Sequence, residues 1–183
     1  MRCFAALDFD EKTLDAILQV QGRIEQILLN SESLEAKAIP KNQMHLTLVF
    51  FPDEREREIN DKVLAFKNLF AKRKSFNFKL GKVVFLPSIG AAKVIALEVE
   101  SPELMALQKE LATALNSKEK RDFKAHLTLF RIKSGIIKSS GQILGVGYDA
   151  AASIEGVAAK FSFKKSTLYS SGPVYENLAV VNL

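Results

Sequence analysis

The sequence contains one cysteine and two histidines, and these low numbers bear on disulfide bonds and on metal sites. Cys3 is the sole cysteine, which excludes an internal disulfide and fits a reducing, cytoplasmic setting. We interpret Cys3 as a small buried strand residue rather than as a nucleophile. The chain has only two histidines, and they lie far from Cys3 and from each other. Such spacing does not suit zinc, so we expect no metal and no other cofactor.

The sequence also lacks any apolar run near the roughly 20 residues that a membrane-spanning helix needs, so we expect no membrane partner. Its first residues include Asp8 and Asp10, which favour a first strand over a signal peptide. A length of 183 residues, 48% of them hydrophobic, indicates an ordinary soluble domain or two small lobes. The net charge of +5 favours an anionic partner without identifying it.

The two histidines carry the strongest signal that is present. His45 and His126 each open the tetrapeptide His-Leu-Thr-Leu. Given two histidines, the next three residues agree by chance only about once in several thousand draws. Histidine is the side chain that titrates near physiological pH, so we interpret the pair as a matched acid and base. The competing interpretation is two core histidines on two similar strands.

Leucine and threonine around each histidine favour a strand, in which successive side chains point to opposite faces. His45 and Thr47 then share one face of their strand, and His126 and Thr128 share one face of theirs. The leucines point to the other face, toward the core. Because a hydroxyl can donate a hydrogen bond to a phosphate oxygen, each segment predicts an imidazole beside a phosphate-binding group.

Hydrophobic periodicity predicts an alternation of strands and helices along the chain. Strands are expected at 2–9, 44–51, 76–80, 83–86, 93–99, 123–132, 160–168 and 174–182. Helices are expected over 12–29, from Pro52-Asp53 to Phe70 with Asp53 as the cap, and from Ser101-Pro102 to Leu115. Residues 30–43 are interpreted as a polar connection, and no element is assigned to 134–152.

The order strand, helix, motif strand occurs twice, and the motifs lie 81 residues apart (126 − 45), close to half the chain. We therefore predict a single domain over 1–183, internally duplicated, with approximate halves 1–90 and 91–183. The predicted fold class is α+β, with two pseudo-twofold-related lobes. Each lobe is a mainly antiparallel sheet with helices outside, and the motif strands face each other across a groove.

A phosphodiester in such a groove could use both histidines. One takes the proton from the nucleophile while the other protonates the leaving oxygen on the opposite side of the phosphorus. The two threonine hydroxyls bind the non-bridging oxygens, whose charge must be stabilised in the transition state. The residues thus predict acid–base catalysis of phosphodiester cleavage.

The paired motifs resemble those of the two-histidine (2H) phosphoesterase superfamily, which is defined by two H-x-[ST]-x segments. Within it, the chain looks like the bacterial and archaeal RNA 2′,3′-cyclic phosphodiesterases, formerly called 2′-5′ RNA ligases. The resemblance runs nearly end to end and includes the segments 2–8 and 40–44, Phe123, Arg131, and the segments 166–168 and 172–175. One departure is Ala125, which stands where the family commonly has proline.

The resemblance implies metal-independent hydrolysis of a terminal RNA 2′,3′-cyclic phosphate to a 2′-phosphate. It assigns His45 as the proton donor to the leaving 3′ oxygen and His126 as the acceptor that activates water. The two identical motifs do not by themselves separate these roles. The expected partners are RNA 3′ ends with a cyclic phosphate, including tRNA fragments or nucleotides, and the protein is expected to be a monomer. Some relatives join or cleave 2′-5′ linkages, so reversible ligation is also implied.

Several alternatives stay open at this point. Arg131 either binds phosphate or has a structural role, since strand parity places it opposite His126 unless a bulge intervenes. Phe130 shares the parity of His126 and could stack on a base. The whole chain could also be a non-catalytic RNA- or nucleotide-binding module, or could act on ADP-ribose cyclic phosphate or 2′-5′ oligonucleotides.

Overall fold

The computed structural model describes residues 1–30, 34–119, 122–137, 140–146, 154–170 and 172–183. The strands are β1 (Arg2–Asp8), β2 (Leu34–Ala38), β3 (Leu46–Phe51), β4 (Phe76–Leu86), β5 (Val94–Glu100), β6 (His126–Gly135), β7 (Glu155–Ala158), β8 (Lys160–Tyr169) and β9 (Gly172–Asn182). The α-helices are α1 (Glu11–Leu29), α2 (Glu56–Phe70), α3 (Pro102–Ala114) and α4 (Ser140–Val146). None of the helices in the described ranges is long and apolar enough to cross a membrane.

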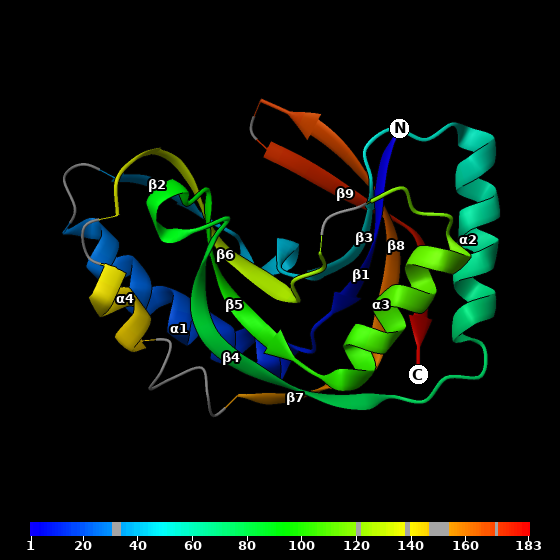
Figure 1. Ribbon diagram of the computed structural model, residues 1–183, viewed down its shortest axis with the longest axis horizontal. Helices are drawn as coiled ribbons and strands as arrows, with labels where there is room; N and C mark the ends of the chain where they lie inside the picture. Colours follow the sequence, from blue (N-terminus) through cyan, green and yellow to red (C-terminus); the bar gives the residue numbers. More distant parts are fainter. Residues whose placement is uncertain (31–33, 120–121, 138–139, 147–153, 171) are drawn as a thin grey trace.

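The strands form two antiparallel sheets, which confirms the predicted α+β class (Figure 1). The first sheet has the order β3-β1-β8-β9, and the second has the order β2-β6-β5-β4-β7. If β2 is set aside, the order β3-β1-β8-β9 in the first sheet corresponds to the order β6-β5-β4-β7 in the second. The motif strands β3 and β6 then occupy equivalent edge positions. This correspondence is the pseudo-twofold relation that the repeated motif predicted.

Neither sheet is built from one half of the chain. Strands β2 and β4 come early in the sequence but belong to the second sheet, and β8 and β9 come late but belong to the first. The helices cross over as well, as Figure 1 shows: α1 follows β1 yet packs against β2 and α4, whereas α3 follows β5 yet packs against β3 and α2. The two lobes are therefore interlocked by their connections.

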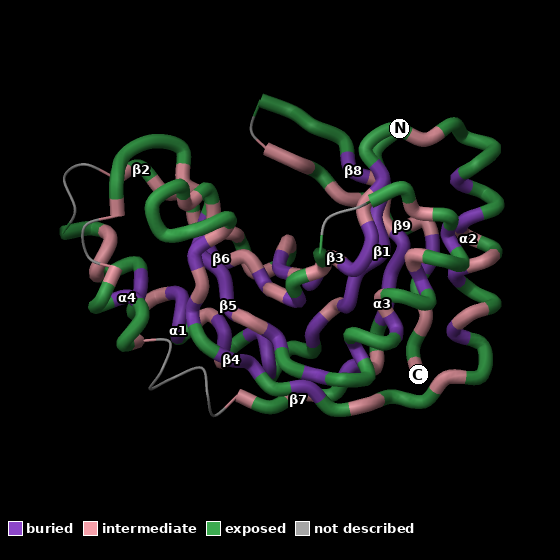
Figure 2. Tube along the Cα trace, viewed as in Figure 1, coloured by how far each residue is buried: buried purple, intermediate pink, exposed green. Residues whose placement is uncertain are grey.

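The core of the first lobe lies between its sheet and α2. Phe66 and Phe70 of α2 pack against Phe161 and Phe163 of β8, with ring centroids 4.6 Å apart for Phe70 and Phe161. Figure 2 shows buried residues along the central strands and exposed residues along the outer faces of the helices. Cys3 is 0% exposed in this core, and burial raises the pKa of its thiol to about 11. Its interpretation as a buried strand residue is confirmed.

The expected start of the second helix is wrong. Helix α2 begins at Glu56 with Arg55 as its N-cap, and the carboxylate of Glu58 accepts a hydrogen bond from the backbone N–H of Arg55 at 3.1 Å. Asp53 does not cap the helix; its carboxylate instead binds the amino terminus of Met1 at 2.8 Å. A local pattern identifies a side chain able to cap, but it cannot reveal a competing ammonium group 52 residues away in sequence.

Other differences concern short or irregular elements. The polar connection at 30–43 contains β2, an edge strand whose outward residues are charged and therefore hide its pattern. Strand β4 is continuous through Gly81, where the pairing with β5 shifts register, instead of forming two strands. Helix α4 lies within 134–152, and residues 138–139 and 147–152 of that stretch are outside the described residues.

Candidate active site

A cavity of about 320 Å³ lies between the two motif strands and contains all five residues that the sequence singled out. His45 and Thr47 line it from the first motif, and His126, Thr128 and Arg131 line it from the second. Further walls come from residues 37–40 and 43, and from Ser170, Gly172, Pro173 and Tyr175 of the β8–β9 hairpin. The groove predicted between the lobes is therefore present, and both imidazoles face it.

Each motif strand contains a β-bulge at its second leucine. In β3, Thr47 pairs with Ala6 and Val49 pairs with Ala5, so Leu48 is the extra residue. In β6 the pairing passes from Thr128–Ala96 to Phe130–Ile95, so Leu129 is the extra residue. The two motif strands thus share this irregularity as well as the side chains of the motif.

The bulge at Leu129 decides which side chains reach the cavity. Strict alternation would place Phe130 on the side of His126 and Arg131 on the opposite side, but the extra residue reverses the parity beyond it. Arg131 consequently lines the cavity, as the sequence allowed if a bulge intervened. Phe130 is 1% exposed, so the suggestion that it stacks on a base is wrong.

Gln21, a residue that sequence analysis missed, supports this bulge from helix α1. It is 6% exposed, and its side-chain amide donates hydrogen bonds to the carbonyl oxygens of Leu129 at 2.9 Å and Ile39 at 3.0 Å. The Leu129 carbonyl also accepts a hydrogen bond from the backbone N–H of Ile39 at 2.8 Å, so the Gln21 amide adds a second bond there and ties α1 to the bulge. The available signal was a polar residue on the apolar face of α1, between Ile17 and Ile24.

The two imidazoles are held in the same way. The Nδ1 atom of His45 lies 2.7 Å from the carbonyl oxygen of Gln43, and that of His126 lies 2.6 Å from the carbonyl oxygen of Lys124. Because a carbonyl oxygen only accepts, Nδ1 carries the hydrogen in both rings. Each Nε2 is then left to take up or give a proton.

The surroundings of His45 disfavour its charged form. Its ring stacks on Phe4 at a centroid distance of 4.8 Å and meets the edge of Tyr175 at 5.2 Å. Burial lowers the pKa of His45 from 6.5 to about 4, and the positive charges of Lys164 and Arg131 add to this effect. The hydrogen bond to Gln43 and the charge of Asp8 oppose it only in part. His45 is therefore neutral at pH 7 in the unliganded protein.

An acid–lysine pair accompanies each histidine on the neighbouring strands. Asp8 follows Leu7, which pairs with Leu46, and thus lies beside His45; its carboxylate binds Lys164 at 2.8 Å. Both side chains of this pair are only 13% exposed. Glu98 pairs with His126, but its contact with Lys82 is 4.0 Å and far more exposed. Sequence analysis missed both pairs, because their lysines come from other strands.

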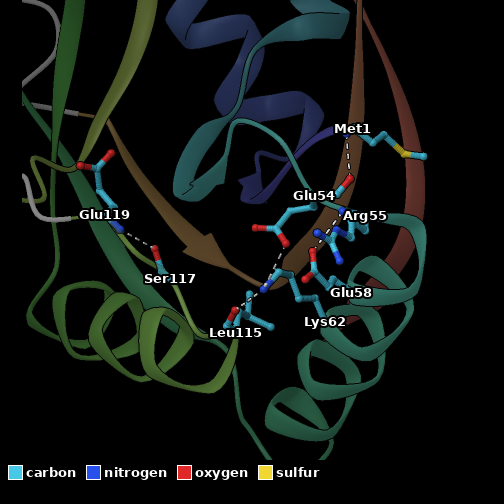
Figure 3. Close-up of polar contacts among 8 residues, drawn as sticks. All are labelled: Met1, Glu54, Arg55, Glu58, Lys62, Leu115, Ser117 and Glu119. Atoms are coloured by element: carbon cyan, nitrogen blue, oxygen red, sulfur yellow. Dashed lines mark hydrogen bonds and ion pairs between the residues drawn. The ribbon is translucent and has the colours of Figure 1, made fainter.

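Charged side chains bind the segments ahead of each motif. Before the first motif, Lys41 binds Glu11 and Asp15 on α1, with Glu11 at 2.7 Å, and this positions the neighbouring Gln43 carbonyl. Before the second, Lys62 reaches from α2 and donates to the carbonyl oxygen of Leu115 at 2.7 Å, where α3 ends (Figure 3).

Lys62 itself is almost buried, being 9% exposed. Its ammonium also lies 3.7 Å from the carboxylate of Glu54 and 4.5 Å from the centre of the Phe51 ring. These contacts join α2, α3 and β3 at one point, ahead of the segment that leads to His126.

The part of the chain that the structure describes brings together no group of three or more His, Cys, Asp or Glu residues that could hold a metal ion. The five residues that the sequence singled out bring two imidazoles, two hydroxyls and one guanidinium to the cavity.

Comparisons with known proteins find similarity along the whole chain. A protein of Methanothermobacter thermautotrophicus named RNA 2′,3′-cyclic phosphodiesterase is 25% identical over 188 residues, which cover 100% of this chain and 99% of that protein. A crystal structure from Thermus thermophilus matches with a TM-score of 0.83 at 23% identity, covering 100% of this chain and 98% of the other.

The structure of Escherichia coli LigT complexed with 3′-AMP matches with a TM-score of 0.70 at 18% identity, covering 100% and 97% of the two chains. These two structural matches establish a common fold. The sequence profile of the 2′-5′ RNA ligase superfamily matches residues 17–134, which include both motifs and the bulge before Arg131. The chain belongs to the 2′-5′ RNA ligase superfamily.

Proposed function

We propose that this protein hydrolyses the terminal 2′,3′-cyclic phosphate of RNA to a 2′-phosphate, using His45 and His126 as acid and base without a metal. The observation that carries the proposal is that both imidazoles line one cavity, each with Nδ1 bound to the carbonyl two residues before it. The full-length similarity to a protein named RNA 2′,3′-cyclic phosphodiesterase supports the same substrate.

In the proposed reaction, His126 takes a proton from water as the water oxygen bonds to phosphorus. The bond from phosphorus to the 3′ oxygen breaks, and that oxygen takes a proton from His45. The roles follow the resemblance, and the surroundings of the rings are compatible with them: the Nδ1 contact of His126 is exposed, whereas that of His45 is partly buried. Each well-placed proton transfer contributes a rate factor of about 10² to 10⁴.

The assigned role of His45 requires it to hold a proton when substrate is bound, although burial lowers its pKa in the unliganded protein. The negative charge of a bound phosphodiester favours the imidazolium and raises that pKa. Protonation of His45 would then accompany substrate binding, so the donor becomes charged only when there is a leaving group to protonate.

Thr47 and Thr128 line the same cavity from one face of each motif strand. Their hydroxyls would donate hydrogen bonds to the two non-bridging oxygens of the phosphate. Arg131 would add a guanidinium, a strong hydrogen-bond donor to phosphate. Lys37 and Lys133 also line the cavity, where the preceding phosphates of an RNA strand would lie, and Lys133 is paired with Glu35 at 2.6 Å.

The decisive experiment is incubation with an RNA that ends in a 2′,3′-cyclic phosphate, in the presence of EDTA, with the terminal phosphate identified in the product. We expect turnover to a 2′-phosphate, and we expect His45→Ala and His126→Ala each to lower kcat by at least 10³-fold. Binding without turnover in the wild type would instead identify a non-catalytic binding module. A panel with ADP-ribose cyclic phosphate and 2′-5′ oligonucleotides identifies the preferred substrate.

The same chemistry run in reverse would join RNA ends. If a 5′-hydroxyl replaces water, the product is a 2′-5′ phosphodiester, so ligation and cleavage of 2′-5′ linkages would use the same two histidines. Detection of a 2′-5′ dinucleotide from a cyclic phosphate and a nucleoside tests this extension.

A further inference from the structure

A second cavity adjoins the candidate active site at His126. It has a volume of about 300 Å³ and lies between the motif strands and helix α3. Its walls include Phe50, Gln108 and Phe123. Thr47 and His126 also line the first cavity, and no other described residue lines both. His45 faces the first cavity and is absent from the walls of the second.

The pseudo-twofold relation between the motifs also relates these cavities. Arg131 stands five residues after His126 and two after the bulged Leu129, and it lines the first cavity. Phe50 stands five residues after His45 and two after the bulged Leu48, and it lines the second. A phosphorus atom between the motifs would therefore have one cavity on each side. One is lined by a guanidinium, and the other by an aromatic ring that has the Arg2 guanidinium over one face, 5.2 Å from the ring centroid.

The charged side chains in the walls of the two cavities also differ. The described walls of the first contain Lys37, Arg131 and Lys133 and no carboxylate, although Lys133 pairs with Glu35, outside the walls, at 2.6 Å. The described walls of the second contain two carboxylates, Glu119 and Asp122, with one ammonium from Lys124. The first suits an RNA end that carries phosphates, whereas the second suits an uncharged group.

A nucleoside has the properties that the second cavity favours. Its base can stack on a phenylalanine ring, as bases do in proteins that bind single strands. It carries no phosphate that the carboxylates would repel. Its 5′-hydroxyl would approach His126, the histidine that the proposed reaction uses as the base.

We propose that the second cavity is the binding site for the nucleoside that supplies a 5′-hydroxyl in 2′-5′ bond formation, and that releases it in 2′-5′ bond cleavage. This inference rests on the proposed function. In the forward direction the 5′ oxygen bonds to phosphorus and gives its proton to His126. The bond to the 3′ oxygen breaks, and that oxygen takes its proton from His45; cleavage reverses every transfer.

The first experiment blocks the second cavity. Gln108→Trp places a large side chain in it, and Lys109→Trp, at an exposed position on the same helix outside its walls, is the matched control. We expect Gln108→Trp to leave hydrolysis of adenosine 2′,3′-cyclic phosphate within twofold of the wild type, while cleavage of 2′-5′-linked adenylyl adenosine falls at least tenfold. The control should change neither rate. An equal change in both rates, or no change in either, would overturn the inference.

The second experiment needs no variant and no turnover, so it separates this inference from the proposed function. Adenosine is titrated into the wild-type protein while the Cε1–H resonances of the two histidines are followed by NMR. We expect a saturable shift of the His126 resonance that exceeds the shift of His45, because only His126 lines the second cavity. A larger shift of His45, or no saturable shift, would contradict the site even if cyclic phosphate is hydrolysed.

Discussion

At the scale of single residues, the two histidines have the same sequence context but different surroundings. Both rings are oriented through Nδ1 by a backbone carbonyl. Only His45 is enclosed by Phe4 and Tyr175, and only His45 has a buried acid–lysine pair beside it. The difference between the two rings therefore arises from neighbours on β1, β8 and β9 and not from the motifs themselves.

The enclosure of His45 predicts a measurable titration. We expect the Cε1–H resonance of His45 to titrate with a pKa near 4 in the unliganded protein, because burial disfavours the imidazolium. A non-hydrolysable cyclic phosphate analogue should raise this pKa by at least one unit, since its charge favours the protonated ring. The measurement is an NMR titration from pH 3 to 9 with and without the analogue. A pKa that stays unchanged on binding would argue against His45 as the proton donor.

At the scale of elements, the bulge in β6 depends on a side chain from another helix. Replacing Gln21 by leucine leaves the carbonyl oxygen of Leu129 with one hydrogen bond fewer in a buried place. We expect the free energy of unfolding to fall by about 1 to 3 kcal/mol, because two hydrogen bonds of the Gln21 amide are lost at about 0.5 to 1.5 kcal/mol each. We also expect weaker binding of cyclic phosphate, because the bulge directs Arg131 into the cavity.

Gln19→Leu is the matched control for this change, since Gln19 lies on the same helix and is exposed. Urea denaturation measures the first effect, and substrate-analogue binding measures the second. If both glutamine variants behave alike, the amide of Gln21 does not support the bulge.

The junction of α2, α3 and β3 provides a second prediction at this scale. Lys62→Met removes the hydrogen bond to Leu115 and leaves Glu54, 18% exposed at its side chain, without its nearest cation. We expect a loss of about 1 to 3 kcal/mol in the free energy of unfolding. Lys67→Met, an exposed change on the same helix, should be nearly neutral. Thermal and urea unfolding of both variants give the comparison, and equal effects would assign Lys62 no special role.

At the scale of the whole molecule, the buried His45 links stability to pH. Between pH 6.5 and about 4 the unfolded chain binds a proton at this residue that the folded chain does not, so acid favours unfolding. Above pH 6.5 His45 is neutral in both the folded and the unfolded chain, so its titration does not lower the free energy of unfolding. As the pH falls to 4, the protonation of His45 in the unfolded chain lowers the free energy of unfolding by about 3 kcal/mol, because each unit of pKa shift corresponds to about 1.4 kcal/mol.

The variant His45→Asn tests this linkage, because asparagine does not titrate. We expect the free energy of unfolding, measured in urea at intervals from pH 4 to 7, to change less steeply with pH in the variant than in the wild type. The carboxylates contribute to both curves equally and cancel in the difference. Parallel curves would mean that His45 binds its proton equally well in the folded and unfolded states.

The sequence predicted this site well where the argument depended on local repetition. Two identical tetrapeptides with alternating side chains were enough to pair the histidines, to direct the threonines with them, and to predict a doubled α+β fold. Periodicity located most strands and three of the four helices in the described part of the chain. It failed at Asp53, at Phe130 and in the short strand β2, because long-range partners determine the structure at each of these places.

The sequence by itself determined which side chains could do acid–base chemistry, because its only two histidines stand in one repeated tetrapeptide. Only the tertiary structure decided that Arg131 reaches the cavity, that His45 is held neutral, and that a second cavity adjoins His126. The physical reason is that a strand pattern fixes the alternation of side chains, whereas bulges, burial and cavities arise only when distant segments pack together.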